Sequence, residues 1–232
     1  VADNGTTTLD GGTVGGTVAD NGTLAVTANG GTAGSLSGSG AGTLAGGLTL
    51  TSAADTYAGA LSGTGGLTVA GGTETLSGAN TYTGSTTIGS GAVLQLGAGG
   101  TTGSIDGTSG INNSGSLVID RSNNVTLAAA ISGAGSLVQQ GSGVTTLTGT
   151  NSYSGGTTIA SGTLAGNTTS FGSGAITDNA ALDVDLASGV TDALANTVSG
   201  TGTLTKTGSG TLEMANPADS YSGGTLVSAG TM

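Results

Sequence analysis

The sequence predicts an all-β fold, a right-handed parallel β-helix of on the order of eleven coils. Three observations lead to this prediction: a five-residue motif that recurs along the chain, short runs of alternating apolar residues, and an unusual composition. The 232 residues include 50 glycines, 43 threonines, one proline, one phenylalanine and no tryptophan. Large side chains are therefore scarce, and a stack of coils has a narrow interior that Leu, Val, Ile and Ala can fill.

The recurring motif reads [Asn/Asp]-[Thr/Ser]-Tyr-[small]-Gly. Its four copies contain Asp55, Tyr57 and Gly59; Asn80, Tyr82 and Gly84; Asn151, Tyr153 and Gly155; and Asp219, Tyr221 and Gly223. All four tyrosines of the chain lie in it. A motif that recurs in this way indicates a stacked repeat protein.

The full repeat is longer than this motif. A glycine-spaced run leads to Leu67, Leu137 and Leu204, which follow one another at a nearly constant interval. The repeat copies are predicted near 62–94, 132–164 and 199–232, with a degenerate copy near 36–60. A second unit with a central Asp or Asn, as at 111–120 and 176–185, alternates with them. The interval is too long for one coil, which takes roughly 20 residues in repeats of this class, and it indicates a few coils of a solenoid.

Alternating apolar residues predict the strands. Leu67-Thr68-Val69 and Leu94-Gln95-Leu96 are typical of such runs. They follow the period of two that marks a strand, and Gly, Asn, Ser or Asp ends each of them. No window shows sustained helical periodicity, so almost no helix is expected. Stacked at about 4.8 Å, the predicted coils would give a rod about 50 Å long. A right-handed crossover is expected, with glycine at corners that need positive φ.

Charge and cysteine content exclude several function classes. The net charge is −11, and Arg121 and Lys206 are the only basic residues, so nucleic acid and anionic membrane surfaces are not expected partners. The absence of cysteine excludes disulfides and thiolate metal sites. No run approaches 18 apolar residues, so direct membrane insertion by this segment is not expected. The chain begins with Val1 and is interpreted as one β-helix fragment, 1–232, of a longer protein.

Catalytic, metal and cofactor sites are not predicted. The chain has no histidine, so Ser-His-Asp and Cys-His catalysis are excluded. Asp183 and Asp185 are two apart on a strand and share a face, but no basic residue is near them in sequence, and a solvated strand face is expected. Asp178 and Asn179 could supply oxygen ligands to calcium, but they are better interpreted as turn residues.

The motif residues have a structural interpretation. Asn80 and Asn151 are expected to be turn residues whose side-chain amides bond nearby backbone groups. The tyrosines are expected to pack at a coil corner. Tyr57 and Tyr82 are separated by a stretch of chain close in length to one coil, so they are candidates for stacking. The alternative is that exposed rings in that arrangement bind carbohydrate.

Threonine pairs of the form Thr-x-Thr suggest a further alternative. They occur at Thr49/Thr51, Thr73/Thr75, Thr146/Thr148 and Thr203/Thr205/Thr207. Such pairs place hydroxyls and methyls on one face of a strand, as in ladders that order water. The pairs do not recur once per coil, so a continuous ladder is not expected, and Thr also suits any half-exposed strand.

One repeat copy carries a family resemblance. The run Gly200-x-Gly-x-Leu204-Thr-Lys206-x-Gly208-x-Gly210-Thr-Leu212, then the motif at Tyr221 and a closing Gly230-Thr231, resembles the autotransporter-associated β-strand repeat. The match is strong around Tyr82, Tyr153 and Tyr221, weak around Tyr57, and covers roughly half the chain. One departure is Asn216-Pro217-Ala218, three residues inserted before the last motif, where a small bulge is expected.

The resemblance implies a passenger of a bacterial type V secretion system. Such passengers are right-handed parallel β-helices that cross an outer-membrane pore and are displayed on the cell surface, and this repeat is associated with their transport and folding. The expected function is therefore structural or adhesive, as a rigid stalk or a contact region, and not enzymatic. Host cells, sibling cells, abiotic surfaces and end-to-end self-association are the expected partners. The alternatives are a polysaccharide-acting β-helix enzyme and an ice- or surface-ordering protein.

Overall fold

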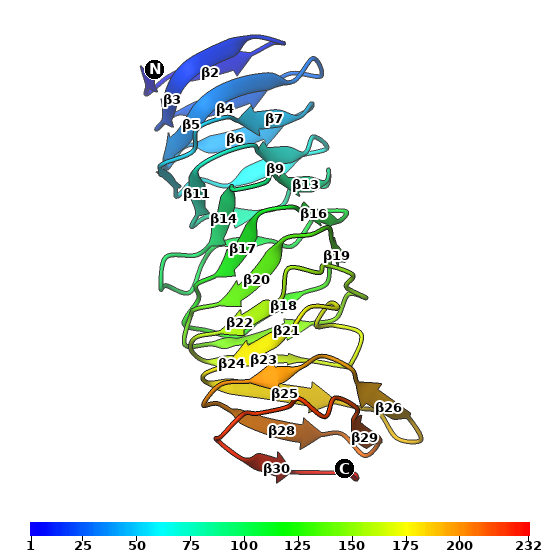
Figure 1. Ribbon diagram of the computed structural model, residues 1–232. Coiled ribbons are helices and arrows are strands. Elements are labelled where there is room, and N and C mark those ends of the chain that lie inside the picture. The colour runs from blue at the N-terminus through cyan, green and yellow to red at the C-terminus, as the bar shows by residue number, and fades with distance from the viewer. The chain divides into compact units, whose positions relative to one another are not determined.

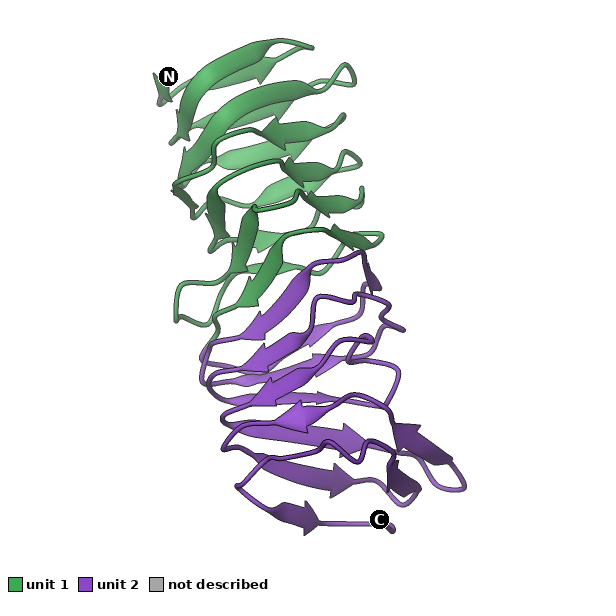
Figure 2. Cartoon of the chain, viewed as in Figure 1, with its two compact units in different colours: residues 1–121 green, residues 122–232 purple. Residues whose placement is uncertain are grey.

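The computed structural model describes residues 1–232, apart from the side chain of Asp3. The chain divides into two compact units, residues 1–121 and 122–232, which are described separately (Figure 2). Both are built from short parallel strands that wind in coils (Figure 1). The chain is an all-β parallel β-solenoid of about 11 turns, and no helix occurs in the described residues. The predicted fold class is confirmed.

Unit 1 contains strands β1 to β17. They are β1 (Ala2–Asp3), β2 (Thr6–Leu9), β3 (Thr13–Asp20), β4 (Thr23–Val26), β5 (Gly31–Gly38), β6 (Ala41–Leu44), β7 (Leu48–Leu50), β8 (Thr56–Tyr57), β9 (Leu61–Gly63), β10 (Leu67–Val69), β11 (Thr73–Leu76), β12 (Ala79–Asn80), β13 (Thr86–Ile88), β14 (Val93–Leu96), β15 (Ser104–Ile105), β16 (Ile111–Asn113) and β17 (Ser116–Ile119).

The coils of unit 1 have three sides, each a parallel ladder. The first side runs β3, β5, β7, β10, β13, β16, and the second runs β8, β11, β14, β17, with the end of β5 against β8. The third side runs β2, β4, β6, β9, with β12 paired to β15. Leu48 pairs with Leu67, which pairs with Thr86, so the chain completes one coil between each of these residues and the next.

Unit 2 contains strands β18 to β30. They are β18 (Val125–Leu127), β19 (Ile131–Ser132), β20 (Ser136–Gln139), β21 (Val144–Leu147), β22 (Thr157–Ile159), β23 (Thr163–Gly166), β24 (Ile176–Asp178), β25 (Ala181–Asp185), β26 (Thr191–Leu194), β27 (Val198–Ser199), β28 (Thr203–Thr207), β29 (Thr211–Met214) and β30 (Thr225–Val227). One ladder runs β20, β22, β24, β27, a second runs β18, β21, β23, β25, β28, β30, and β26 pairs with β29.

Inward-facing residues form a thin apolar core in each unit. Successive strand residues alternate between buried and more exposed, as in β7 and β10, because neighbouring side chains on a strand point to opposite faces. Leu, Ile and Val dominate the buried positions, and Phe171 is fully buried in unit 2. The alternation that predicted strands from the sequence is therefore the pattern that fills the coil interior.

Paired glycines make one type of corner possible. In Ser62-Gly63-Thr64-Gly65, Gly63 has φ of 102°, a conformation that favours glycine. A Cβ on Gly65 would lie 1.9 Å from the carbonyl oxygen of Gly46 in the preceding coil. The first glycine therefore turns the chain, and the second lets two coils approach each other.

The second sequence unit supplies another type of corner. Asp20, Asn113 and Asp178 are buried at the ends of their strands. Each side-chain Oδ1 accepts a hydrogen bond from the backbone N–H two residues on, at Gly22 (3.1 Å), Gly115 (3.1 Å) and Ala180 (3.0 Å). These are Asx turns, so the interpretation of Asp178 as a turn residue is confirmed.

Long polar side chains fill a third type of corner. Gln139 donates to the carbonyl oxygens of Gly141 (2.8 Å) and Gly143 (3.2 Å). Lys206 occupies the same place in the last repeat copy, is fully buried, and donates to the carbonyl oxygens of Thr207 and Gly208. Arg121 is also buried and donates to the carbonyl oxygen of Gly103 (2.9 Å). Both basic side chains of the chain are therefore used inside the coils.

One buried acid lies inside unit 1. Glu74 is fully buried on β11, where its Oε2 accepts from the Ser35 hydroxyl (3.2 Å) and the Leu36 N–H (3.5 Å). Its Oε1 has no hydrogen-bond partner among the described atoms. Burial, with a smaller contribution from the nearby charge of Asp55, raises the pKa of Glu74 to about 8, although the hydrogen bonds from Leu36 and Ser35 oppose the change. The carboxyl is therefore largely protonated at neutral pH.

We predict that Gly65→Ala destabilises unit 1 by about 1–3 kcal/mol, because the added Cβ overlaps backbone that has no room to move. Urea unfolding measures this change. Gly12→Ala is the control, since nothing lies within 4 Å of a Cβ at Gly12, and it should change stability by less than about 0.5 kcal/mol. Equal effects of the two substitutions would contradict the close approach of coils at Gly65.

We predict that Glu74 makes unit 1 less stable as pH rises. Its folded pKa is about 8 and its ordinary value is 4.5, so the folded state retains a proton that the unfolded state loses. Stability should fall as pH rises from about 4.5 to about 8, by on the order of 5 kcal/mol, and then level off. Urea unfolding at several pH values should show this slope in the parent, whereas Glu74→Gln should lack it. A slope that persists in Glu74→Gln would assign the effect to other groups.

Candidate functional site

The motif places an Asn or Asp oxygen against a backbone N–H of the preceding coil in three copies. The Leu61 N–H donates to Asn80 Oδ1 (2.9 Å), the Ile131 N–H to Asn151 Oδ1 (2.7 Å), and the Val198 N–H to Asp219 Oδ1 (2.8 Å). Asn80 and Asn151 are buried. The expectation that their side chains bond backbone groups is therefore confirmed, and the three copies share one geometry.

The asparagines also reach the following coil. Asn80 Nδ2 donates to the Ser104 carbonyl oxygen (2.8 Å), and Asn151 Nδ2 donates to that of Ser170 (2.6 Å). Each asparagine thus bonds the coil before it and the coil after it. Asp219 cannot donate in this way, and its Oδ2 has no hydrogen-bond partner among the described atoms. The third copy therefore keeps only the bond to the preceding coil.

Three of the four motif tyrosines bond a threonine four residues later. Tyr82 bonds Thr86 and Tyr153 bonds Thr157, with 2.7 Å between hydroxyl oxygens in each pair, and both tyrosines are fully buried. Burial raises the pKa of Tyr153 to about 12, and that of Tyr82 also rises. These hydroxyls stay protonated, and the predicted packing role is confirmed for both residues. Buried rings cannot form the carbohydrate platform considered as the alternative.

The partly exposed Tyr221 makes the same contact with Thr225, at 2.6 Å. The threonine partners were missed in the sequence, although the spacing Tyr-x-x-x-Thr is visible there in all three copies. The backbone amides at Leu61, Ile131 and Val198 carry no signal in the sequence, because any residue except proline supplies one.

The motif glycines stack on the paired-glycine corner of the preceding coil. The N–H of Gly84 donates to the Gly65 carbonyl oxygen (3.2 Å), and that of Gly155 donates to Gly135 (3.0 Å). A Cβ on Gly84 would lie 2.4 Å from the Gly65 carbonyl carbon. Gly223 stands in the same relation to Gly202, with an N–H bond of 3.1 Å. The motif of one coil thus requires the glycines of the coil before it.

The Tyr57 copy matches the motif in sequence but lies at a different position in the coil. Tyr57 lies in β8, pairs in register with Leu76, and its hydroxyl bonds Gly40 (2.7 Å) and Asp20 (3.0 Å). Asp55 accepts from the Thr17 hydroxyl (2.9 Å) instead of a backbone amide. Gly59 retains one feature, since a Cβ there would lie 1.8 Å from the Gly40 carbonyl oxygen.

The expected stacking of Tyr57 on Tyr82 is wrong. The N–H groups on either side of Tyr82 bond the carbonyls of Leu61 and Gly63, which places Tyr82 over Ser62. Tyr57 lies on another side of the coil, over Gly38. The stretch from Tyr57 to Tyr82 resembled one coil in length, but the coils of this region are shorter, as the register from Leu48 to Leu67 shows.

The repeats of unit 2 are rotated relative to one another. The register runs through successive coils from Leu137 to Thr157, Ile176 and Val198. Leu204, the counterpart of Leu137, lies beyond Val198 and pairs with Leu182 on the next side. The repeat period in this unit is therefore three coils plus one side. Tyr153 and Tyr221 consequently occupy different corners, and the motif cannot form one continuous face.

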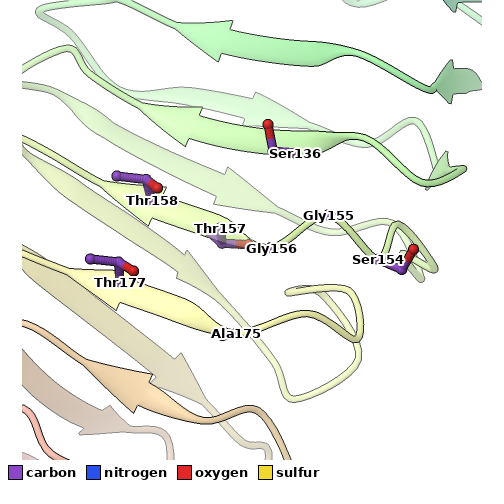
Figure 3. A pocket seen from close by; sticks show the side chains of 8 residues that line it. All are labelled: Ser136, Ser154, Gly155, Gly156, Thr157, Thr158, Ala175 and Thr177. Atoms are coloured by element: carbon purple, nitrogen blue, oxygen red, sulfur yellow. The ribbon is translucent and has the colours of Figure 1, made fainter. Parts of the chain in front are cut away.

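Three depressions lie on the described surface of unit 2, and two of them are lined by Asp183 or by residues of the motif. One, of about 390 Å³, is lined by Asp183 and Asp185, and the Thr207 hydroxyl donates to Asp183 (2.7 Å). Its lining contains carboxylates and hydroxyls but no basic residue. The other, of about 250 Å³, is lined by hydroxyls and glycines that include Ser154, Gly155 and Thr158 (Figure 3). In the described residues, no three acidic side chains are grouped so as to hold a metal ion.

This geometry defines a class of protein, a parallel β-solenoid whose sequence repeat locks successive coils at their corners. The family model of the Passenger-associated-transport-repeat matches residues 71–96, 137–165 and 204–232. The chain thus carries three passenger-associated transport repeats in a β-solenoid, as in the passenger β-helices of autotransporters. The comparison with curated proteins found no match, nor did that with solved structures. No helix of the described chain is long and apolar enough to span a membrane.

We predict that Asn151→Ala lowers the free energy of unfolding by about 1–3 kcal/mol, because it leaves the buried Ile131 N–H without an acceptor. Amide hydrogen exchange should show faster exchange at Ile131 in particular. Asn151→Asp retains that acceptor but loses the donor to Ser170, so it should leave Ile131 protected. Ser152→Ala, at the exposed neighbouring position, is the control and should change stability by less than about 0.5 kcal/mol. Unchanged protection of Ile131 in Asn151→Ala would refute the coil-locking role.

Proposed function

We propose that this segment is a rigid, surface-displayed part of an autotransporter passenger, acting as a stalk or a contact region outside the cell. The proposal rests on one observation: the residues of the repeat motif form hydrogen bonds within the solenoid. Its Asn, Tyr and Gly residues at Asn80, Tyr82 and Gly84 are engaged with neighbouring coils. The motif therefore stabilises the solenoid and leaves the outer faces free to vary.

The stiffness follows from backbone pairing. Every described coil of unit 1 pairs with its neighbours through parallel ladders, and the corners between ladders are satisfied by side chains such as Asn80. Buried backbone polar groups that lacked partners would each cost free energy. This fold needs no disulfide, nucleotide or cofactor to form, and coils that fold outside the cell would help to retain an exported chain there.

The proposed partners are surfaces of host cells, sibling cells or abiotic material, with end-to-end association as a further mode. The chain has a net charge of −11, and both of its basic side chains, Arg121 and Lys206, are buried. Charged polyanions such as nucleic acids would be repelled. We assign no catalytic role to Asp183 and Asp185, because a depression with carboxylates and no basic neighbour gives a polysaccharide-cleaving enzyme too few groups.

A display experiment tests this function. The 232 residues would be displayed on a non-adherent bacterium, and retention of cells on host cells, sibling cells and abiotic surfaces would be counted. An unrelated rod of equal length is the control, and antibody staining measures display. Retention above the control would identify an adhesive contact region. Display with no added retention would identify a stalk. A segment that is displayed but rapidly cleaved by added protease would contradict the rigid solenoid and with it the proposal.

A further inference from the structure

A file of threonines follows the first side of unit 1. Successive coils place one threonine at the same strand position, and these pair in register from strand to strand. The threonine file consists of Thr13, Thr32, Thr49, Thr68 and Thr87. Asn112 follows Thr87 on the next coil. As expected, the Thr-x-Thr pairs form no continuous ladder, since Thr51 is followed by Ala70 and Gly89 at the same position of the next coils. A single threonine per coil does recur on this face, which was not predicted from the sequence.

The threonine file is flanked mostly by small residues. The chain direction and backbone hydrogen bonds place Gly47, Gly66 and Ser85 on one flank, and Thr51, Ala70 and Gly89 on the other. Glycine and alanine do not rise above the sheet as threonine does. The threonines Thr32, Thr49, Thr68 and Thr87 are all partly exposed, and Thr13 is exposed. Their hydroxyls and methyls thus form the raised part of this side.

The exposed residues of the same side carry no charge, because Asp20, the charged residue of β3, is buried. Strands β5, β7, β10, β13 and β16 contain no Asp, Glu, Lys or Arg, although the chain has 13 acidic residues. The acids of unit 1 lie elsewhere, for example Asp10 at a corner and Glu74 in the interior. The file is also free of aromatic residues. A face without charges or rings is suited neither to ionic ligands nor to sugar rings that stack.

Unit 2 contains a shorter file of the same kind. Thr158 pairs with Thr177, and Thr177 pairs with Ser199. Figure 3 shows Thr158 and Thr177 on adjacent strands with their side chains pointing the same way. The hydroxyl-lined depression of about 250 Å³ adjoins this file. The arrangement therefore occurs in each unit.

Parallel pairing gives such a file a regular spacing. Adjacent strands lie about 4.8 Å apart, and a β-branched side chain has few χ1 rotamers on a strand. Hydroxyls and methyls consequently repeat at nearly constant intervals on a backbone that cannot shift. Water that bonds one hydroxyl is held at the same interval from water on the next. An array of this kind favours an ordered layer of water over a disordered one.

We propose that the threonine file of unit 1 binds the surface of ice through such an ordered water layer. The partner must be flat, because the residues that flank the threonines are mostly Gly, Ala and Ser and offer no large side chains to enclose a ligand, and uncharged, because the exposed residues of the face are. It must also be periodic, because the file is. This inference goes beyond display or adhesion, and a failure here would leave the proposed stalk unaffected.

Inhibition of ice recrystallisation by the 232-residue chain tests the proposal. The parent should slow crystal growth, and Thr49→Lys/Thr68→Lys should raise the concentration needed for half-maximal inhibition about tenfold or more. Thr23→Lys/Thr43→Lys places the same charges at exposed positions of β4 and β6 on another side and should behave as the parent does. Thr49→Val/Thr68→Val, which keeps the shape and strand propensity, should weaken inhibition through the loss of the hydroxyls. Circular dichroism and urea unfolding confirm that each variant folds.

Three results would overturn the proposal. The first is a parent that fails to inhibit recrystallisation at any soluble concentration. The second is an equal loss of ice-recrystallisation inhibition in the threonine-file variants and in the β4/β6 control, which would show a general effect of added charge. The third is retention of the parent on insoluble neutral polysaccharide, abolished by the file substitutions, without any effect on ice. That last result would assign the face to glycan recognition instead.

Discussion

The structure depends on satisfying the backbone at the corners of each coil. Strand ladders pair the N–H and C=O groups along the sides, but at a corner the chain turns and regular pairing stops. An unpaired buried amide there would cost free energy in every coil. The asparagine of the motif satisfies two such backbone groups. Asn151 Oδ1 accepts from the Ile131 N–H in the preceding coil, and its Nδ2 donates to the Ser170 carbonyl oxygen in the following one. One side chain thus links three coils at a place where the backbone alone cannot.

Much of the repetitive composition follows from that constraint. A Cβ on Gly84 would overlap the Gly65 backbone, and a Cβ on Gly65 would overlap the Gly46 carbonyl of the coil before it, so successive coils need glycine at this corner. Gln139 and Lys206 occupy one position with different chemistry, and each donates to the carbonyls of its own corner. The shared requirement is a long donor, not a charge. This is why one of two basic residues in so acidic a chain is fully buried.

The sequence predicted the fold through its strand periodicity and predicted the roles of Asn80, Asn151, Tyr82 and Tyr153 through turn chemistry. It could not place the tyrosines relative to one another. The coils differ in length, so the sequence alone does not show on which side of a coil each tyrosine lies. Tyr57 matches the motif in sequence, yet it lies within a strand. The threonine file was missed for a different reason: the chain has so many threonines that a nearly regular recurrence of five of them does not stand out, and only strand register shows which ones lie side by side.

The position of the repeat motif around the coil also bears on which residues can have a contact function. Because the period in unit 2 is three coils plus one side, successive motifs face different directions, as Tyr153 and Tyr221 do. A ligand could not contact several copies on one face, so the motif suits an internal role. Outer faces are then free to differ, and they do: strands β7 and β10, which carry Thr49 and Thr68, have no charged residue, whereas Asp183 and Asp185 lie together on a side of unit 2. A contact function therefore belongs to the residues between the motifs, where side chains are not committed to holding coils together.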